Sequence, residues 1–523
     1  MKRFIPAWYT DHDWWSNQAV PFYMRGAVVN EFDDLISLMG MHLKNEVPFE
    51  IITLNYMPDL RSFLHRHELF EAPYWSVFDH IQGFAHQTPH SVDYRQLNWP
   101  KETEFVHSPV MIRAITSEDM YSDIHFSQEG YLLWIETYKN DIGYEQYIFD
   151  DRGFLSSYVK ANEDGYWFEK YYMTADGDWI MKENIFTNHV TIHPKYAHRF
   201  KQTKYEEMSF VIEEYLSAYI QQTIQPHDVM IVASDVRHNL LIAEHLNGQK
   251  LCFSVFQKRD TWRSDEGMIS MTNGSYWLAD TLENENHLTH FLNQYQFNNQ
   301  LMRITPFDVQ MTPNISSQLH ETYIGVWVDG LTEASLRQIT NQLIQEIERE
   351  PLTRVVLLTR FDINHTPIWM HAEVLRIQKY FDDRSKQPEL VQDVGKYNSN
   401  DRIVYASLKN VPFENDIVEA ISTLRLVIDM NEEPDLFLQI CCMGAGLPQI
   451  NRMQTDYVQH ERNGYIISDI ESLPLAMNFY LTHLKNWNRS YAYAMKLAKM
   501  YGSDEILKQL DDWLEGETHG TEI

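Results

Sequence analysis

Glycines recur at positions 130, 143, 153, 165 and 177, in a stretch rich in tyrosine, tryptophan and phenylalanine. Two of them follow aspartate, and Asp-Gly between alternating apolar residues is a strong signal for a hairpin turn. Such regular turns leave room for one strand between each pair. The spacing therefore predicts an antiparallel β-meander over residues 105–195. Asp176-Gly177-Asp178 falls on this period, so we interpret it as a turn and not as a metal-binding Asp-x-Asp motif.

The sequence on either side alternates apolar strand patterns with amphipathic helix patterns, which predicts parallel sheets. The first half has expected strands at 4–9, 50–56, 228–234 and 250–257, and expected helices at 32–43, 60–82 with a break at Pro73, 205–221 and 239–246. The second half has expected strands at 323–328, 354–359, 403–407, 426–429, 436–442 and 465–467, a helix at 333–349 and a helical tail at 473–514.

Together these patterns predict an α/β chain with two Rossmann-like domains that face each other and an inserted antiparallel β-meander. The first Rossmann-like domain is expected at 1–104 plus 196–310, and the meander at 105–195. The second Rossmann-like domain is expected at 320–485, followed by a helical tail at 486–523.

The turn Gly446-Leu447-Pro448-Gln449-Ile450 and the strand Asn463-Gly464-Tyr465-Ile466-Ile467 are the most informative motif in the chain. Their order and spacing resemble the nucleotide-sugar half of a GT-B glycosyltransferase. Active members of that class usually carry two glutamates, separated by seven residues, near this turn. Here the two positions fall at Glu433 and Cys441, or at Met443 and Asn451 in a second register. At least one carboxylate is therefore missing.

The glycines that would cradle a diphosphate are missing as well, since none lies between Gly446 and Gly464. Phosphate binding needs several converging backbone N–H groups, which glycine-rich turns or helix N-termini usually supply. We therefore expect a transferase-like fold with no catalytic residues, no cofactor and no metal.

Longer matches identify one family. The chain resembles the first of the three accessory secretory proteins of the accessory Sec system of Gram-positive bacteria, over essentially its whole length. The segments that carry the resemblance are Phe4-Ile-Pro-Ala-Trp-Tyr, Asp13-Trp-Trp-Ser, Phe32-Asp-Asp, Asn55-Tyr-Met-Pro-Asp-Leu-Arg-Ser-Phe-Leu-His-Arg, Tyr74-Trp-Ser-Val-Phe-Asp, Asp150-Asp-Arg-Gly-Phe-Leu-Ser-Ser and Gly446-Leu-Pro-Gln-Ile-Asn-Arg-Met-Gln-Thr-Asp-Tyr-Val.

This resemblance implies a role in the export of glycosylated serine-rich-repeat adhesins. The implied partners are the second and third accessory secretory proteins, the accessory SecA motor and the adhesin itself. The resemblance also implies a GT-B-like fold without transferase activity. It further implies that the inserted β-domain is like the one that contributes to acceptor binding in adhesin-modifying glycosyltransferases.

The composition fits a cytoplasmic protein that does not bind nucleic acid. The formal net charge is −31, which opposes binding to a polyanion. Its three cysteines, Cys252, Cys441 and Cys442, are expected to be packed in the interior and not paired in disulfides. There is no apolar run of membrane-spanning length, so any membrane contact is expected to be peripheral.

Two groups of residues are candidates for binding a ligand or a partner. Trp8, Trp14 and Trp15 follow the first strand, where ligands bind in open α/β sheets; the favoured alternative is a hydrophobic plug. Gln449, Asn451, Arg452 and Asp456 occupy the place of the donor sugar in an active relative. Polar satisfaction within a tight loop explains this second group at least as well.

The sequence leaves a second hypothesis open, in which the chain is an active glycosyltransferase that moves a UDP-sugar to a serine-rich acceptor. In that case Glu433 would bind the donor and Arg452 would meet its phosphate. For the favoured, non-catalytic hypothesis, we expect deletion of residues 105–195 to weaken adhesin or partner binding and to leave the two α/β domains folded.

Overall fold

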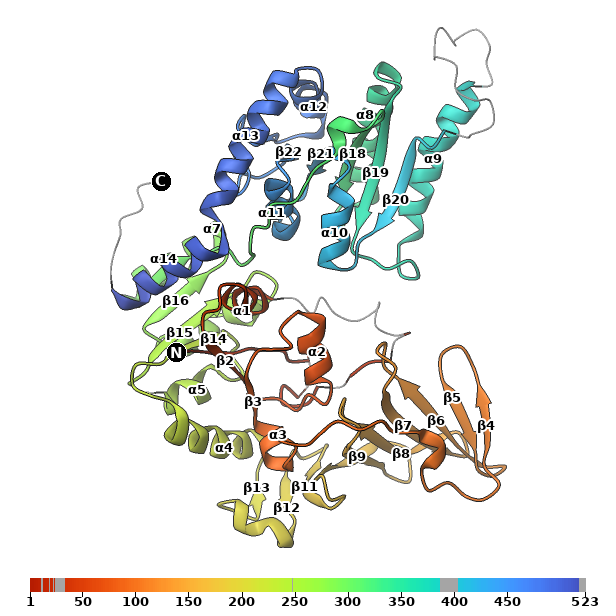
Figure 1. Cartoon of the computed structure of the whole chain (residues 1–523), viewed down its shortest axis with the longest axis vertical. Coiled ribbons are helices and arrows are strands. Elements are labelled where there is room, and N and C mark those ends of the chain that lie inside the picture. Colours follow the sequence, from red (N-terminus) through yellow and green to blue (C-terminus); the bar gives the residue numbers. More distant parts are fainter. Residues whose placement is uncertain are drawn as a thin grey trace. The chain divides into compact units, whose positions relative to one another are not determined.

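The computed structural model describes residues 1–10, 13–17, 19–21, 23, 33–246, 248–385 and 403–516. The chain forms two compact units. The first comprises Met1–Pro306 together with Asp512–Ile523, and the second is Phe307–Asp511. Each unit contains one parallel sheet, and the first also contains an antiparallel sheet (Figure 1).

The parallel sheet of the first unit has seven strands in the order β17-β16-β15-β14-β1-β2-β3. The strands are β1 (Lys2–Ile5), β2 (Phe49–Thr53), β3 (Tyr74–Ser76), β14 (Val229–Ala233), β15 (Lys250–Val255), β16 (Tyr276–Ala279) and β17 (Gln300–Arg303). The chain runs outward from β1 to β3 and later from β14 to β17 on the other side, so the strand order reverses between β1 and β14. This reversal is where an open α/β sheet usually binds its ligand.

Helices connect these strands as a parallel sheet requires. They are α1 (Asp34–Lys44), α2 (Leu60–Arg66), α3 (Val77–Gln82), α4 (Met208–Thr223), α5 (Asn239–His245), α6 (Asp265–Met271) and α7 (Leu282–Tyr295). Pro73 lies between α2 and β3, so the expected break in the 60–82 region is confirmed. The expected opening strand at 4–9 is shorter and ends at Ile5. Phe32, the first residue of the expected 32–43 helix, lies outside the described residues.

The expected meander is confirmed as a ten-stranded antiparallel sheet whose strands pair in sequence order. They are β4 (Glu104–His107), β5 (Ile112–Ile115), β6 (Met120–Phe126), β7 (Leu132–Lys139), β8 (Ile142–Phe149), β9 (Leu155–Ala161), β10 (Trp167–Met173), β11 (Trp179–Asn184), β12 (Val190–Ile192) and β13 (Lys204–Tyr205). The Asp176-Gly177 turn joins β10 to β11, with Gly177 at a φ of +83°. The backbone N–H of Thr174 donates to the carbonyl of Asp178 across this turn at 2.8 Å.

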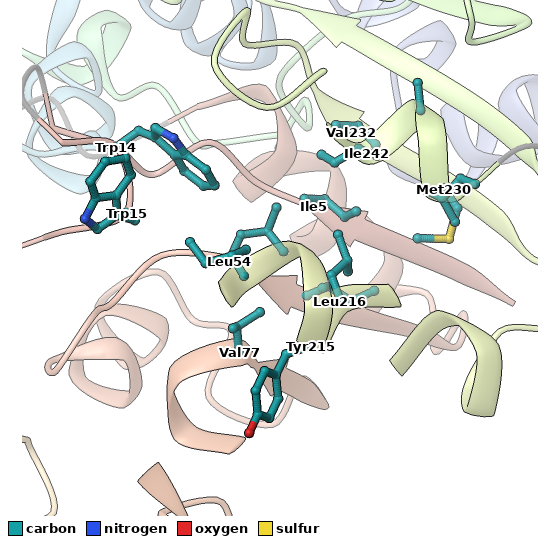
Figure 2. Close-up of a cluster of buried hydrophobic side chains, with 14 of the residues drawn as sticks. Ile5, Trp14, Trp15, Leu54, Val77, Tyr215, Leu216, Met230, Val232 and Ile242 are labelled. Atoms are coloured by element: carbon teal, nitrogen blue, oxygen red, sulfur yellow. The ribbon is translucent and has the colours of Figure 1, made fainter. Parts of the chain in front are cut away.

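One hydrophobic core is shared by the two sheets of the first unit. It joins Ile5 and Val232 of the parallel sheet to Tyr172, Met181 and Ile192 of the meander. Figure 2 shows the part of this core around Ile5, Leu54 and Val232, with Trp14 and Trp15 beside it. Deletion of 105–195 would uncover these side chains. The packing therefore argues against the expectation that such a deletion leaves the first α/β domain folded.

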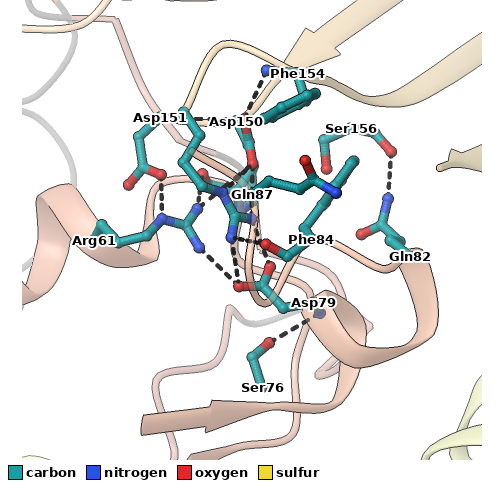
Figure 3. A network of polar contacts seen from close by, with 12 residues as sticks. Arg61, Ser76, Asp79, Gln82, Phe84, Gln87, Asp150, Asp151, Phe154 and Ser156 are labelled. Carbon is teal, nitrogen blue, oxygen red and sulfur yellow. Dashed lines mark hydrogen bonds and ion pairs between the residues drawn. The ribbon is translucent and has the colours of Figure 1, made fainter. Parts of the chain in front are cut away.

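A buried ionic cluster forms a second attachment between the two sheets (Figure 3). The guanidinium of Arg152 donates to both oxygens of Asp79 at 2.8 and 3.0 Å, and to Asp150 at 2.8 Å. Arg61 of α2 also donates to Asp79 at 2.9 Å and pairs with Asp151. Burial raises the pKa of Asp151 to about 6, although the charge of Arg61 opposes the shift. The cluster ties α2 and α3 to the turn between β8 and β9.

The parallel sheet of the second unit has six strands in the order β20-β19-β18-β21-β22-β23. These are β18 (Thr322–Trp327), β19 (Thr353–Thr359), β20 (Ala406–Asn410), β21 (Leu424–Asp429), β22 (Gln449–Asn451) and β23 (Gly464–Ile466). Its order reverses between β18 and β21. The helices are α8 (Glu333–Arg349), α9 (Ile368–Ser385), α10 (Glu414–Ile421), α11 (Leu436–Gly444), α12 (Leu473–Leu481), α13 (Leu484–Met500) and α14 (Ser503–Glu515), the last of which ends in the first unit.

The expected strand at 436–442 is wrong, because these residues form helix α11. The side chain of Asp435 caps the helix by accepting from the backbone N–H of Leu438 at 2.9 Å. Gly446, at a φ of +68°, follows the end of the helix. A short apolar run does not distinguish a buried strand from a buried helix, so these two end signals should have decided. The sequence analysis also missed β22, which begins inside the expected turn, and the elements from α6 to β17.

Candidate ligand sites at the carboxyl ends of the two parallel sheets

The predicted tryptophan group lies at the carboxyl end of β1, next to the strand-order reversal of the first unit. Trp8, Trp14 and Trp15 are only 8%, 7% and 5% exposed. Trp8 packs on Phe63 of α2, with 4.6 Å between ring centroids. The indole N–H of Trp15 donates to Glu183 of the meander at 2.7 Å. The burial of all three rings supports the hydrophobic-plug alternative.

Side chains of the protein also close the space after β14. The hydroxyl of Tyr9 and the Nδ1 atom of His238 are 2.6 Å apart, and Nε2 of His238 lies 2.8 Å from the carbonyl oxygen of Ala233. A carbonyl can only accept, so Nε2 carries the proton and Nδ1 accepts from Tyr9. Burial lowers the pKa of His238 to about 4, so the ring is neutral near pH 7. Both polar groups are thus satisfied within the fold.

In the second unit, three aspartates gather at the reversal between β18 and β21. Asp329 follows β18, Asp429 ends β21, and Asp435 caps α11. Asp329 accepts from the hydroxyl of Thr359 at 2.5 Å and from the backbone N–H of Arg360 at 2.7 Å. Burial raises the pKa of Asp329, and it raises the pKa of Asp429 to about 7.

Asn431 closes the reversal point. Its side-chain amide donates to the carbonyl of Asp329 and to the carboxylate of Asp429, both at 2.8 Å. It also fills the space above Gly330, which has a φ of +85°. A Cβ built on Gly330 would lie 2.8 Å from Oδ1 of Asn431.

The backbone donors at the start of α11 are occupied by carboxylates of the chain itself. The N–H of Asp435 donates to Asp429 at 3.1 Å, and the N–H of Leu438 donates to Asp435 at 2.9 Å. Helix N-terminal N–H groups of this kind are what a diphosphate would need. The guanidinium of Arg360 is also committed, to Asp435 at 3.2 Å and Glu414 at 3.4 Å. An anionic ligand here would meet carboxylates instead of free donors.

The polar residues predicted from the Gly446 motif lie on β22 and the loop after it. Gln449 is buried and donates to the carbonyl of Gln439 at 3.0 Å. Asn451 is fully buried, and within the described residues neither its side-chain oxygen nor its nitrogen has a hydrogen-bond partner. Arg452 is partly exposed and pairs with the exposed Glu432 at 3.4 Å. Asp456 is half-buried. The four residues therefore do not converge on one open site.

The two glutamate positions of the favoured register frame α11. Glu433 is exposed and precedes the helix, whereas Cys441 lies within it. Burial raises the pKa of the Cys441 thiol, which is therefore uncharged near neutral pH. Sequence reasoning missed Asp329, Asp429 and Asn431, although both aspartates directly follow apolar runs that were expected to be strands.

A family model for the first of the accessory Sec system proteins of the Asp series matches residues 1–517. The chain belongs to this family. A member from Staphylococcus aureus with the same description is 43% identical over 521 residues, which cover 100% of both chains. The resemblance inferred from the sequence motifs is thereby confirmed.

Solved structures extend the comparison to glycosyltransferases. The crystal structure of accessory secretory proteins 1, 2 and 3 of Streptococcus pneumoniae contains a chain with 24% identity and a TM-score of 0.83, over 99% of both chains. The pneumococcal O-GlcNAc transferase GtfA in complex with UDP and GlcNAc has 12% identity and a TM-score of 0.69, again over 99% of both chains. These likenesses confirm the GT-B-like fold. Among the described helices, none combines the length and apolar composition required to span a bilayer.

Proposed function

We propose that this protein is a non-catalytic, GT-B-like component of the accessory Sec export system. It binds glycosylated serine-rich-repeat adhesin and accessory partners, and it helps to pass the adhesin to the accessory SecA motor. Membership of the family supports the role in export. The fold shared with a glycosyltransferase supports a link to a glycosylated substrate.

The observation that carries the non-catalytic part is the seat of Asn431 at the reversal between β18 and β21. This amide bridges Asp329 and Asp429, at the position where an open α/β sheet would receive a nucleotide. The adjacent N–H groups of α11 are already bonded to Asp429 and Asp435. A diphosphate would have to displace these bonds and approach three carboxylates, which opposes nucleotide-sugar binding.

The proposed partners include the second and third accessory secretory proteins. Accessory secretory proteins 1, 2 and 3 of S. pneumoniae were solved together in one crystal structure, and this chain belongs to the family of the first. We place the protein in the cytoplasm, with peripheral contact at the inner face of the membrane. Its net charge of −31 opposes nucleic acid as a partner.

The alternative is an active transferase in which the exposed Glu433 binds a UDP-sugar and Arg452 meets its phosphate. The pairing of Arg452 with Glu432 leaves this arginine near the carboxyl end of β22. In the favoured register, Cys441 takes the place of the second carboxylate. This substitution argues against the alternative.

The deciding experiment measures UDP release from UDP-N-acetylglucosamine by the purified full chain, with a glycosylated serine-rich acceptor present. An active O-GlcNAc transferase in the same buffer serves as the positive control. We expect release no higher than buffer and no UDP binding by calorimetry. UDP release coupled to sugar incorporation, and abolished by Glu433→Ala, would establish the alternative instead.

The export role is tested by co-purification of the full chain with the second and third accessory proteins and with glycosylated adhesin. Point substitutions on exposed surfaces are better suited to this test than deletion of 105–195, because that deletion would break the shared core. Failure to associate with any of these partners would contradict the proposed role.

A further inference from the structure

A continuous row of aromatic rings crosses one face of the ten-stranded sheet. Tyr147 of β8 stacks on Tyr158 of β9 with centroids 5.0 Å apart, and Tyr158 contacts Tyr171 of β10 at 5.6 Å. The row continues from Tyr171 to Trp179 of β11 at 5.7 Å. It then passes to His193, which follows β12, at 4.3 Å. We call these five side chains the aromatic row.

The aromatic row lies on the outer face of the sheet. Alternate residues of a strand point to opposite faces, and the two neighbours of each strand tyrosine are buried, for example Lys170 and Tyr172 around Tyr171. The face that carries Tyr172 belongs to the shared core. By contrast, all five members of the row are half-buried, so solvent reaches them.

Carboxylates hold the tyrosine rings in place. Glu145 accepts from the hydroxyls of Tyr147 and Tyr158 at 2.7 and 2.6 Å. Glu169 accepts from the hydroxyl of Tyr171 at 2.6 Å. A carboxylate has about four acceptor positions, so these groups retain capacity for further hydroxyl donors. The row therefore combines oriented rings with acceptors that are already fixed.

The charges beside the row balance each other. Lys182 pairs with Glu169 at 2.7 Å. Lys160 is opposite Glu145 in the strand register, and its ammonium lies 5.3 Å from the ring centre of Tyr158. A surface with paired charges does not favour a strongly anionic or cationic partner. It suits an uncharged ligand with apolar C–H faces and many hydroxyl groups.

A saccharide has this chemistry. One face of a pyranose ring presents C–H groups that pack on aromatic rings, and its hydroxyls donate to carboxylates. The rings of the row follow one another at 4.3–5.7 Å, a repeat comparable to the size of one sugar ring. Successive strands create this repeat, since they lie about 4.8 Å apart. The row can therefore contact several sugars in succession.

We infer that the aromatic row is a saccharide-binding surface that receives the O-linked sugars of an extended serine-rich polypeptide. This inference rests on the proposed function and deepens it by naming the surface and the chemical class that it binds. Cross-strand aromatic contacts also stabilise a sheet, but that role requires neither solvent exposure nor paired charges on the same face.

The test measures binding of a synthetic serine-rich peptide with O-linked N-acetylglucosamine, and of the same peptide without sugar. The protein is the full chain, alone and in complex with the second and third accessory proteins. We expect the glycopeptide to bind and the bare peptide to bind at least tenfold more weakly. Trp179→Ala and Tyr171→Ala remove rings, so each is expected to weaken glycopeptide binding at least tenfold.

Two further variants serve as controls. Tyr171→Phe keeps the ring but loses the bond to Glu169, and we expect a change of less than about threefold. Tyr138→Ala removes a half-buried ring that stacks on Tyr121 at 5.0 Å, on the opposite face by strand alternation. Binding to this variant should equal that of wild type. Urea unfolding of every variant checks its fold, and if one ring-removing variant unfolds, the other one decides.

Unchanged glycopeptide affinity in a folded Trp179→Ala or Tyr171→Ala variant would overturn the inference. Equal binding of the bare peptide would also overturn it, because the surface would then recognise polypeptide. Neither result affects the UDP-release and co-purification tests of the proposed function. Conversely, UDP turnover would contradict the proposed function and leave the assignment of the aromatic row intact.

Discussion

The side-chain amide of Asn431 donates to the carbonyl oxygen of Asp329, 102 residues earlier in the chain, at 2.8 Å. This bond joins the segments that follow β18 and β21, the two strands between which the sheet order reverses. In a nucleotide-binding sheet this position is left open for the ligand. Here it is closed by a bond within the fold, and the same amide also holds Asp429.

The first prediction concerns this bond. Asn431→Ala should destabilise the second unit by about 1–3 kcal/mol, because it leaves buried acceptors on Asp329 and Asp429 without their donor. The measurement is urea unfolding followed by a probe in the second unit. Arg452→Ala is the matched control. It breaks a partly exposed ion pair and should cost less than about 1 kcal/mol. Equal effects of the two substitutions would contradict a structural role for Asn431.

The second prediction concerns the buried ionic cluster of Figure 3. Arg152→Met should destabilise the first unit by about 3–5 kcal/mol, because the buried carboxylates of Asp79 and Asp150 lose their charge partner. Thermal and urea unfolding measure the change. Arg95→Met removes an exposed arginine that pairs with Asp93 and should leave the unfolding midpoint unchanged. A small effect of Arg152→Met would mean that Arg61 alone holds the cluster.

Regular elements could be predicted from the sequence where local signals agree. Helix α8 is found at Glu333–Arg349, as expected, because an amphipathic pattern follows the capping residue Thr332. The strand expected at 436–442 failed because its apolar run carries no periodicity. The capping role of Asp435 was the signal that the sequence analysis overlooked.

The candidate sites were less predictable than the fold. The bond between Asn431 and Asp329 joins residues from separate βα units, so no spacing in the sequence indicates it. The position of Trp15 after β1 was predicted, but its hydrogen bond to Glu183 arises only when the meander packs on the parallel sheet. Residues that meet through tertiary packing thus decide both reversal points.

The third prediction is a pH dependence at Lys170, which lies in the shared core region with its ammonium 4.2 Å from the ring centre of Tyr56. Burial lowers the pKa of Lys170 from 10.5 to about 8. Between pH 8 and 10.5 the unfolded chain therefore binds more protons than the folded one, so this group makes stability rise with pH in that window. Below pH 8 both states are protonated and its contribution is constant.

Lys170→Met should abolish this rise. The difference in unfolding free energy between wild type and variant should change by roughly 3 kcal/mol across the window, at about 1.4 kcal/mol per pH unit. Urea unfolding at pH 7 to 10.5 measures it. Lys182→Met, on the outer face, should keep the wild-type profile. A parallel pair of curves for wild type and Lys170→Met would show that Lys170 does not titrate in this range.

The fourth prediction separates backbone strain from steric overlap at two glycines. Gly446 and Gly177 have φ values of +68° and +83°, so alanine at either position costs about 1–2 kcal/mol in the left-handed region. A Cβ at Gly177 meets no atom within 4 Å, whereas a Cβ at Gly446 would lie 2.2 Å from the ring of Tyr491 on α13. Tyr491 is itself stacked on Trp487, so it cannot give way without disturbing that contact.

Gly446→Ala should therefore destabilise the second unit by clearly more than Gly177→Ala destabilises the first, each measured in the unfolding transition of its own unit. A double-mutant cycle tests the steric cause within one unit. Adding Tyr491→Ala removes the clashing ring, so Gly446→Ala in that background should cost only the backbone term. If its cost stays the same with and without Tyr491, the packing of α13 on the Gly446 turn does not explain why glycine stands there.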